Sequence, residues 1–249
     1  MADAGRGRHE AEPAFVLHSY PFRETSLIIE AFTRSYGRVA LVARGARRPR
    51  SALRGILMAF QPLLLDWGGK AELRTLFKAE WQGGLPLLQG RALLCGFYLN
   101  ELLLKLLARD DAHEALFEAY HATLGALSNG GDHAVTLRGF EQRLLKEAGY
   151  ALTLDHDVST GEAIRADCSY EYKLERGPVR IMGQTGSPGN DEEKRLEFTG
   201  QTLIDMARED FSNAVTLLQS KALMRMVINH CLGNQTLNTR QLLKEMQQL

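Results

Sequence analysis

This sequence has few cysteines, no long apolar run and no net charge. Its three cysteines, Cys95, Cys168 and Cys231, lie far apart and form no CxxC pair. Their spacing argues against a disulfide framework and against a zinc ribbon. No apolar run approaches the roughly 20 residues that cross a bilayer. The first residues carry charges but no apolar core of the kind a signal peptide has. We therefore expect a cytoplasmic protein with no membrane segment.

The sequence also lacks the short motifs of common enzyme classes. It contains no GxxxxGK[ST], GxGxxG, GxSxG or HExxH pattern. His113 and His121 are two helical turns apart, about 12 Å, which is too far for two ligands of one metal. His156 and Asp157 precede Cys168 and could hold a metal, but their spacing matches no standard site. We expect no catalytic residue, no cofactor and no metal.

The charges balance over the whole chain but not along it. The 249 residues, enough for one large or two small domains, carry 30 Lys and Arg against 30 Asp and Glu. Residues 1–81 hold 13 basic and 8 acidic side chains, whereas residues 82–249 hold 17 basic and 22 acidic ones. A polyanion is therefore expected to bind at the N-terminal end.

Residues 14–81 have the pattern of a small β structure. Five short runs rich in Val, Leu, Ile and Phe are separated by turn residues, at 14–20, 25–33, 38–45, 61–67 and 71–81. Five strands in so short a segment favour a closed barrel, because a small open sheet would leave unpaired edges. Residues 1–12 are expected to be a disordered leader.

After Pro86 the apolar residues recur at steps of three and four, which predicts helices. We expect helices over 87–108, 112–127 and 134–148, forming an antiparallel bundle. A small hairpin is expected to pair 169–173 with 178–182, followed by a mobile loop over 183–193. Further helices are predicted over the ranges 200–208, 213–231 and 239–247.

The strongest functional signal is a run of arginines. Between residues 31 and 65 there are seven Arg and no Asp or Glu. A guanidinium binds phosphate in a bidentate way and stacks on bases. Tyr36 stands in a turn between two of these arginines, where exposure to a base is expected. A solubilising loop is the simpler alternative, but the imbalance favours nucleic acid. The predicted DNA-binding residues are Arg34, Tyr36, Arg38, Arg44, Arg47, Arg48, Arg50 and Arg54.

Several short motifs in order make the chain similar to RecO, the bacterial recombination-mediator family of DNA repair. They are Phe15-Val16-Leu17, Glu24-Thr25-Ser26-Leu27, Gly37-Arg38-Val39, the segment from Val42 to Arg47, Gln61-Pro62-Leu63, the segment from Tyr98 to Leu102, the segment from Leu137 to Glu141, and Gly149-Tyr150. The resemblance implies an α+β protein. An OB-fold barrel over 13–82 would precede an α-helical domain over 83–249, with a zinc-finger-like insertion at about 153–198.

The resemblance also implies function and partners. Such proteins bind single- and double-stranded DNA, anneal complementary strands and work with RecR to load RecA onto strands coated by single-stranded-DNA-binding protein, which would associate this chain with the nucleoid. Many relatives carry four cysteines in the insertion, beginning with a CxxCG pair. Here the matching stretch is residues 156–161, and only Cys168 remains nearby. The resemblance therefore implies an insertion that persists as a metal-free hairpin.

The acidic tail of single-stranded-DNA-binding protein needs an apolar pocket with a basic rim. The third predicted helix offers an apolar floor and a basic rim, although its apolar residues could equally be bundle core. The predicted partner-binding residues are Arg138, Phe140, Arg143, Leu144 and Lys146.

Two other classes of function stay open. In the first, the arginine loop binds an acidic protein partner and the chain is an interaction module. In the second, the chain is a metal-dependent nuclease, which the lack of paired carboxylates at the basic end disfavours.

Overall fold

The structure, a computed structural model, describes residues 7–182, 196–233 and 235–246. Within them the chain forms two compact units, one of residues up to 133 together with those from 237 onward, the other of residues 134–236. This division differs from the expected boundary at residue 83, because helices that follow the barrel pack with it. The expected mobile loop over 183–193 lies outside the described residues. In the described part of the chain, no helix is both long and apolar enough to span a membrane.

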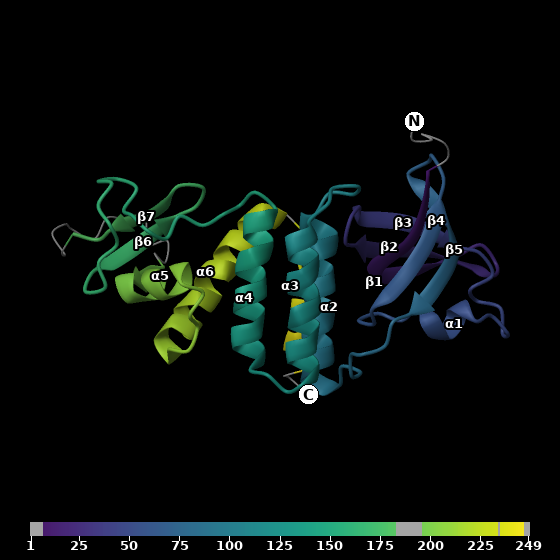
Figure 1. The fold of residues 1–249 in the computed structure, drawn as a ribbon. Coiled ribbons are helices and arrows are strands. Elements are labelled where there is room, and N and C mark those ends of the chain that lie inside the picture. The colour runs from purple at the N-terminus through teal and green to yellow at the C-terminus, as the bar shows by residue number, and fades with distance from the viewer. Residues whose placement is uncertain (1–6, 183–195, 234, 247–249) are drawn as a thin grey trace. The chain divides into compact units, whose positions relative to one another are not determined.

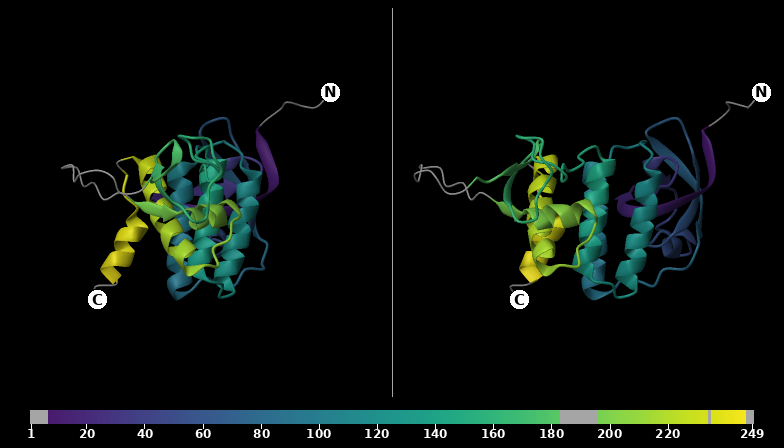
Figure 2. Two further views of the ribbon diagram at one scale, coloured as in Figure 1. Left: turned by 90° about the vertical axis from the view of Figure 1, so that its left-hand side faces the viewer. Right: turned by 60° about the vertical axis from the view of Figure 1, so that its left-hand side comes forward.

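The first unit contains a closed barrel of five strands in the order β1-β2-β3-β5-β4 (Figures 1 and 2). All neighbours are antiparallel except β3 and β5, which are parallel. A five-stranded barrel with this order is an OB-type fold, so the prediction of an OB-type barrel is confirmed. The strands are β1 (Arg8–Phe22), β2 (Ser26–Thr33), β3 (Gly37–Ala43), β4 (Leu63–Gly68) and β5 (Leu73–Trp81).

Alternation along the strands fills the barrel. Val39, Leu41 and Ala43 of β3 point inward and pack with Ile29 and Ala31 of β2. The intervening residues of these strands point outward. This alternation decides which side chains of β2 and β3 reach the helices of the unit.

The predicted leader is wrong for the residues that the structure describes. Residues 8–12 are the start of β1, where Arg8 lies opposite Gly68 and His9 opposite Trp67 of β4. The backbone N–H of Ala11 also donates to a carboxylate oxygen of Asp66 at 2.8 Å. Backbone pairing with β4 holds this segment although it lacks the apolar alternation on which the sequence-based prediction depends.

Two helices cover one side of the barrel, namely α2 (Gly90–Leu106) and α3 (Glu114–Ser128). Phe117 and Tyr120 of α3 pack on Phe15 of β1 and Phe32 of β2, with ring centroids 5.1–6.1 Å apart. Both barrel residues are almost fully buried. The helix α1 (Leu53–Ile56), which the sequence pattern did not predict, lies in the connection from β3 to β4 and packs against β5.

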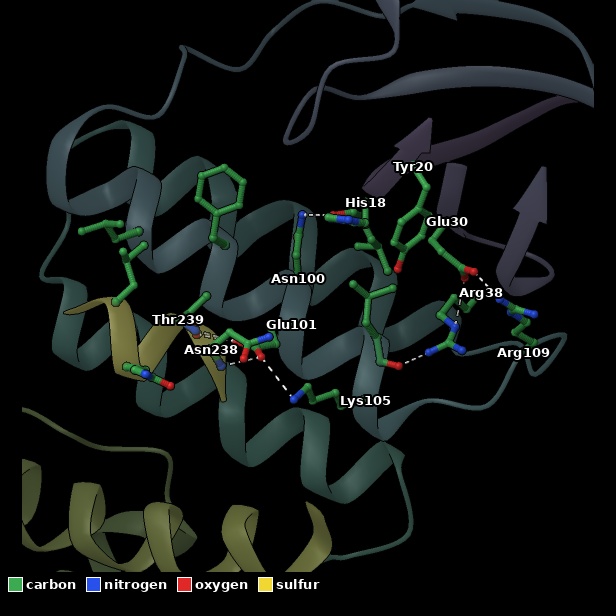
Figure 3. A pocket seen from close by; sticks show the side chains of 16 residues that line it. His18, Tyr20, Glu30, Arg38, Asn100, Glu101, Lys105, Arg109, Asn238 and Thr239 are labelled. Carbon is green, nitrogen blue, oxygen red and sulfur yellow. Dashed lines mark hydrogen bonds and ion pairs between the residues drawn. The ribbon is translucent and has the colours of Figure 1, made fainter. Parts of the chain in front are cut away.

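The last helix, α7 (Asn238–Met246), packs against α2 in the same unit. The Glu101 carboxylate accepts hydrogen bonds from the backbone N–H groups of Asn238 and Thr239 at 2.8 and 2.9 Å (Figure 3). Burial would raise the pKa of Glu101, but these bonds and Lys105 hold it below its usual value. A cleft of about 930 Å³ opens beside this contact and is lined by β1, β2, β3, α2 and α7.

The second unit combines helices with a small sheet. The hairpin of the sheet pairs Tyr170 with Arg180 and Tyr172 with Pro178, within the two ranges expected to pair. A third strand, residues 197–199, pairs with the other edge of the first hairpin strand, residues 169–173. Tyr170 and Tyr172 are buried, as their alternation predicts. The elements are α4 (His133–Glu147), β6 (Ser169–Lys173), β7 (Gly177–Arg180), β8 (Glu197–Thr199), α5 (Gly200–Ala207) and α6 (Ala214–Leu232).

Candidate nucleic-acid interface

Five of the predicted DNA-binding arginines lie on the connection between β3 and β4. A succession of tight turns carries them: Arg48 N–H donates to Gly45 O at 3.1 Å and Ser51 N–H to Arg48 O at 3.0 Å. Ala46, between them, is fully buried and belongs to the barrel core. The loop is thus anchored to the barrel while its arginine side chains are exposed. They are Arg44, Arg47, Arg48, Arg50 and Arg54.

The structure adds a sixth arginine that the sequence analysis missed. The N–H of Arg47 donates to the carbonyl of Thr25 at 2.8 Å, which joins the arginine loop to the turn between β1 and β2. Arg23 lies in that turn, is exposed, and has its guanidinium 5.1 Å from the ring centroid of Phe22. Arg23 could have been found from the strand order, because the β1–β2 turn and the β3–β4 connection lie at the same end of an OB barrel. We call Arg23, Arg44, Arg47, Arg48, Arg50 and Arg54 the arginine cluster.

The arginine cluster carries uncompensated charge. Among the described residues, none of its six guanidinium groups forms an ion pair with a carboxylate. Arg47 alone makes side-chain contacts, at 3.4 Å, with the carbonyl oxygens of Arg23 and Glu24. Exposed cations without acidic partners are available to phosphates, and each phosphate bound releases counterions.

Arg34 and Tyr36 do not join the arginine cluster. They lie in the turn after β2, at the opposite end of this strand from the arginine cluster, and the eight residues of the strand span roughly 25 Å. Arg34 is paired with Glu114 and Glu118 of α3 at 2.7 and 3.0 Å. The Tyr36 ring is packed edge-on against His9, with ring centroids 4.2 Å apart. The prediction of one continuous site is therefore wrong for these two residues.

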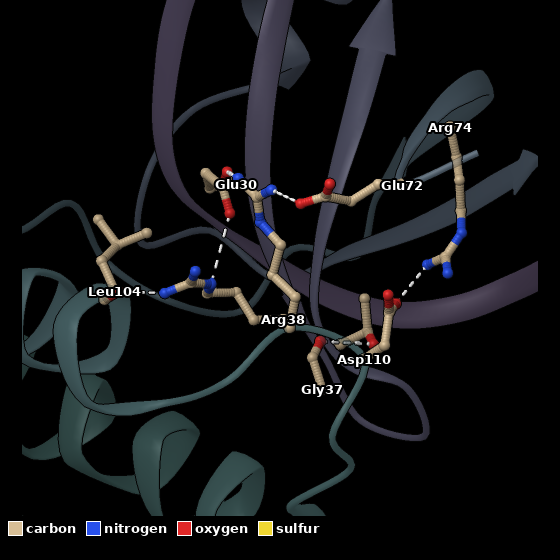
Figure 4. A network of polar contacts seen from close by, with 9 residues as sticks. Glu30, Gly37, Arg38, Glu72, Arg74, Leu104 and Asp110 are labelled. Atoms are coloured by element: carbon tan, nitrogen blue, oxygen red, sulfur yellow. Dashed lines mark hydrogen bonds and ion pairs between the residues drawn. The ribbon is translucent and has the colours of Figure 1, made fainter.

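Arg38 is also misplaced by the sequence analysis. Its side chain is only 15% exposed, and its guanidinium pairs with Glu30 and donates to the carbonyl oxygen of Leu104 (Figure 4). Burial lowers the pKa of Arg38 from its usual value. Arg38 points outward from β3 toward α2, so it binds protein groups and is removed from the predicted interface.

The helices also decide which face of the barrel is open. OB barrels commonly bind oligonucleotides on the face of strands 2 and 3. Here Phe32 on that face is fully buried under α3, and Glu30 is 4% exposed. This face is therefore covered by protein, whereas the arginine cluster at the end of the barrel is exposed.

The predicted partner pocket on α4 is largely wrong. Arg138 is buried and pairs with the buried Glu141 at 2.6 Å. Phe140 and Leu144, the expected floor, are 2% and 0% exposed. Their spacing marks the core face of the helix, as it does in most amphipathic helices. Two of the predicted residues keep accessible side chains, Arg143, which lies 4.0 Å from Glu147, and Lys146.

An aspartate organises the turn at residues 157–160, at the start of the segment for which the resemblance implied a metal-free insertion. One oxygen of Asp157 accepts hydrogen bonds from the N–H of Ser159 at 2.7 Å, from its hydroxyl at 2.5 Å, and from the N–H of Thr160 at 3.3 Å. The other accepts from the N–H of Arg180 on β7 at 2.8 Å. Among the described residues no three His, Cys, Asp or Glu side chains come close enough to hold a metal. The carboxylate thus ties this turn to the hairpin, together with the backbone N–H of Val158, which donates to the carbonyl oxygen of Pro178 at 2.9 Å.

Replacing Asp157 by alanine is expected to lower the free energy of unfolding at pH 7 by about 3 kcal/mol, because the buried carboxylate accepts four hydrogen bonds that are lost together. Burial would raise the pKa of Asp157, but the hydrogen bonds from Ser159, Arg180 and Thr160 hold it below the usual value. Because the pKa of Asp157 is lower in the folded state than in the unfolded state, where it is about 3.9, the ionised carboxylate stabilises the fold at any pH above the unfolded value. This contribution to the free energy of unfolding is lost as the pH falls through the folded-state pKa.

Urea unfolding of the full chain at several pH values measures this effect. The difference between the wild type and the Asp157→Ala variant should shrink below about pH 4. Asp167→Ala is the matched control, because within the described residues this exposed aspartate contacts only the exposed Arg165 and the half-buried Cys168, and its loss should leave the free energy of unfolding nearly unchanged. Equal losses in the two variants would show that Asp157 is not an organising residue.

Comparison with known proteins gives two family matches that together span most of the chain. Residues 9–84 match the family model described as recombination protein O N terminal. Residues 87–236 match the model described as recombination protein O C terminal. The first match covers the barrel, and the second covers the segment from the start of α2 to the end of the second unit.

Individual relatives agree with the family models. The chain is 60% identical to the DNA repair protein RecO of Nitrosospira multiformis, over 97% of this chain and 98% of the relative. It is 57% identical to that of Aromatoleum aromaticum, over 97% and 98% of the two chains. For Azoarcus sp. strain BH72 the identity is 54%, over 99% and 100%. The similarity therefore extends over both units, beyond the barrel alone.

Proposed function

Because the chain belongs to the RecO family of DNA repair and recombination proteins, we propose that it binds single- and double-stranded DNA through the arginine cluster. The observation that carries this proposal is the set of six exposed arginines, without acidic partners among the described residues, at one end of the barrel. Membership of the family supports DNA as the ligand, and the exposed arginines support this end of the barrel as the binding surface.

The proposed activity is strand annealing and needs no covalent chemistry. Guanidinium groups neutralise phosphates of two strands at once, which lowers the repulsion between complementary bases. Base pairing then supplies the driving force. The protein accelerates encounter without breaking a bond, so we propose a mediator and not an enzyme.

Family membership also supports a set of proposed protein partners. RecR and the acidic tail of single-stranded-DNA-binding protein would bind directly, and RecA would be loaded indirectly. Of the surface first predicted for the tail, Arg143 and Lys146 remain as accessible cations on α4. These partners would bring the chain to coated single strands at the nucleoid.

A fluorescence titration with labelled single-stranded DNA across a salt series tests the proposed function. If four to six phosphates are neutralised, the log–log slope of affinity against salt should be roughly −3 to −4, at about 0.7 per contact. A slope near zero would exclude the arginine cluster as the DNA-binding surface and favour an interaction module that binds an acidic protein. Incubation with magnesium and labelled strands should leave the strands intact, and cleavage would favour the nuclease alternative.

A further inference from the structure

The two tryptophans of this chain lie in opposite environments. Trp67 on β4 is 0% exposed and belongs to the barrel core. Trp81, the last residue of β5, is 60% exposed. An exposed tryptophan leaves a large aromatic face open to water and therefore accessible to a planar ligand.

Trp81 is also held in a fixed orientation. Its indole N–H donates to the side-chain oxygen of Gln61 at 3.1 Å. Gln61 is itself only 5% exposed, and its amide nitrogen donates to the carbonyl of Leu85 at 3.4 Å. A buried glutamine thus fixes one edge of an otherwise open ring. Such a ring loses little conformational entropy when a ligand stacks on it.

Trp81 and the arginine cluster lie at the same end of the barrel. Gln61 closes the connection that begins with Arg44, and β4 then starts at Leu63, directly opposite Trp81. The helix α1, which carries Arg54, packs against β5 within this connection, and Figure 1 shows it beside the end of that strand. One connection therefore supplies both the cations and the residue that orients the ring.

We propose that Trp81 is a base-stacking platform for a single strand whose phosphates follow the arginine cluster. This inference rests on the proposed DNA binding and deepens it. Every base has a π-face, so stacking on an aromatic ring binds single strands with little sequence preference. In a duplex the bases are paired and stacked on one another, and the ring cannot reach their faces. Trp81 therefore gives the site a preference for single strands over duplex, which the arginines alone do not provide.

The loss of this platform has a distinctive signature. Trp81→Ala should lower the affinity for a single strand about tenfold, with an unchanged salt slope, because stacking involves no phosphate. Its affinity for duplex DNA should stay the same, and Trp81→Phe should retain most of the binding. Phe77→Ala is the matched control: this ring on the same strand is 54% exposed but lies next to Gly68 and Arg8, away from the cluster, and its loss should change neither affinity.

Tryptophan fluorescence reports the contact directly. In a Trp67→Phe variant, Trp81 is the only tryptophan, and a single strand should quench it while a duplex of equal length should not. Trp67 donates no hydrogen bond within the described residues, so the phenylalanine leaves no partner unsatisfied. In Trp81→Phe the remaining Trp67 should show no quenching, which provides the complementary measurement in a second variant.

The outcomes separate this inference from the proposed function. Arginine-dependent binding with an unquenched Trp81 and no loss in Trp81→Ala would overturn the stacking platform alone. A wild-type protein that binds no DNA would overturn both proposals. If Trp81→Ala lowers the affinity for single strands and for duplex by the same tenfold factor, Trp81 stabilises the site without distinguishing single strands from duplex. This result would also overturn the inference.

Discussion

Replacing Arg47, Arg48 and Arg50 together by alanine is expected to weaken the binding of single-stranded DNA roughly 100-fold at 0.1 M salt. Three phosphate contacts at about 0.7 each should flatten the log–log salt slope by about 2, which corresponds to that loss at this salt concentration. The melting temperature should stay nearly unchanged, because all three side chains are exposed and form no ion pair with described residues.

The matched control removes the same charge elsewhere. Arg176, Arg208 and Arg225 in the second unit are also exposed and form no ion pair with the described residues, although the charge of Asp210 acts on Arg208 from a longer distance. Changing these three arginines to alanine should alter the log–log salt slope by less than half as much as replacing Arg47, Arg48 and Arg50 does. Similar slopes for the two triple variants would mean that DNA responds to net charge and not to the arginine cluster. Both are compared by fluorescence titration at four or more salt concentrations.

The architecture was largely predictable because it depends on local patterns. Alternation within 38–45 put Val39, Leu41 and Ala43 on one face of a strand, and in the structure this face lines the barrel core. Steps of three and four predicted the helices beyond residue 87, and each has a counterpart in the structure. Two elements were missed, α1 and β8, which have four and three residues and are too short to show a period.

The candidate site was predicted only in part because the partners of a charge are not local in sequence. Arg34 and Arg38 look like Arg44 in the sequence, but Glu114 and Glu118 pair with Arg34, and Leu104 accepts a bond from Arg38. These three partners lie 66 to 84 residues away, and no spacing rule reaches them, whereas Glu30, the carboxylate partner of Arg38, is only eight residues away on the neighbouring strand. The arginines between β3 and β4 form no ion pair with a carboxylate in the described part of the chain, and Arg47 contacts only backbone carbonyl oxygens.

The same reasoning explains the error on α4. An apolar stripe at helical spacing predicts that a helix has a buried face, but it does not say whether protein core or a partner covers it. Phe140 and Leu144 turned out to be core residues. Arg138 is buried beside this core because it forms an ion pair with Glu141, three residues later on the helix, which neutralises its charge.

Replacing Glu30 by glutamine is expected to lower the free energy of unfolding by about 3 kcal/mol. Glu30 is 4% exposed and pairs with Arg38 of β3 and with Arg109, which follows α2. Removing one member of a buried ion pair leaves the other charges without compensation, and such losses typically reach about 3–5 kcal/mol. Urea unfolding of the full chain, followed by circular dichroism, measures the change.

Glu72→Gln is the matched control, since Glu72 also pairs with Arg109 but its side chain is 73% exposed. An exposed pair contributes at most about 1 kcal/mol. The double variant with Glu30→Leu and Arg38→Met should recover much of the stability that Glu30→Gln loses, because both buried charges disappear together. Since Arg38 lies outside the arginine cluster, this double variant should bind single-stranded DNA with the wild-type affinity and salt slope. A flattened slope would return Arg38 to the interface and contradict the division between structural and DNA-binding arginines.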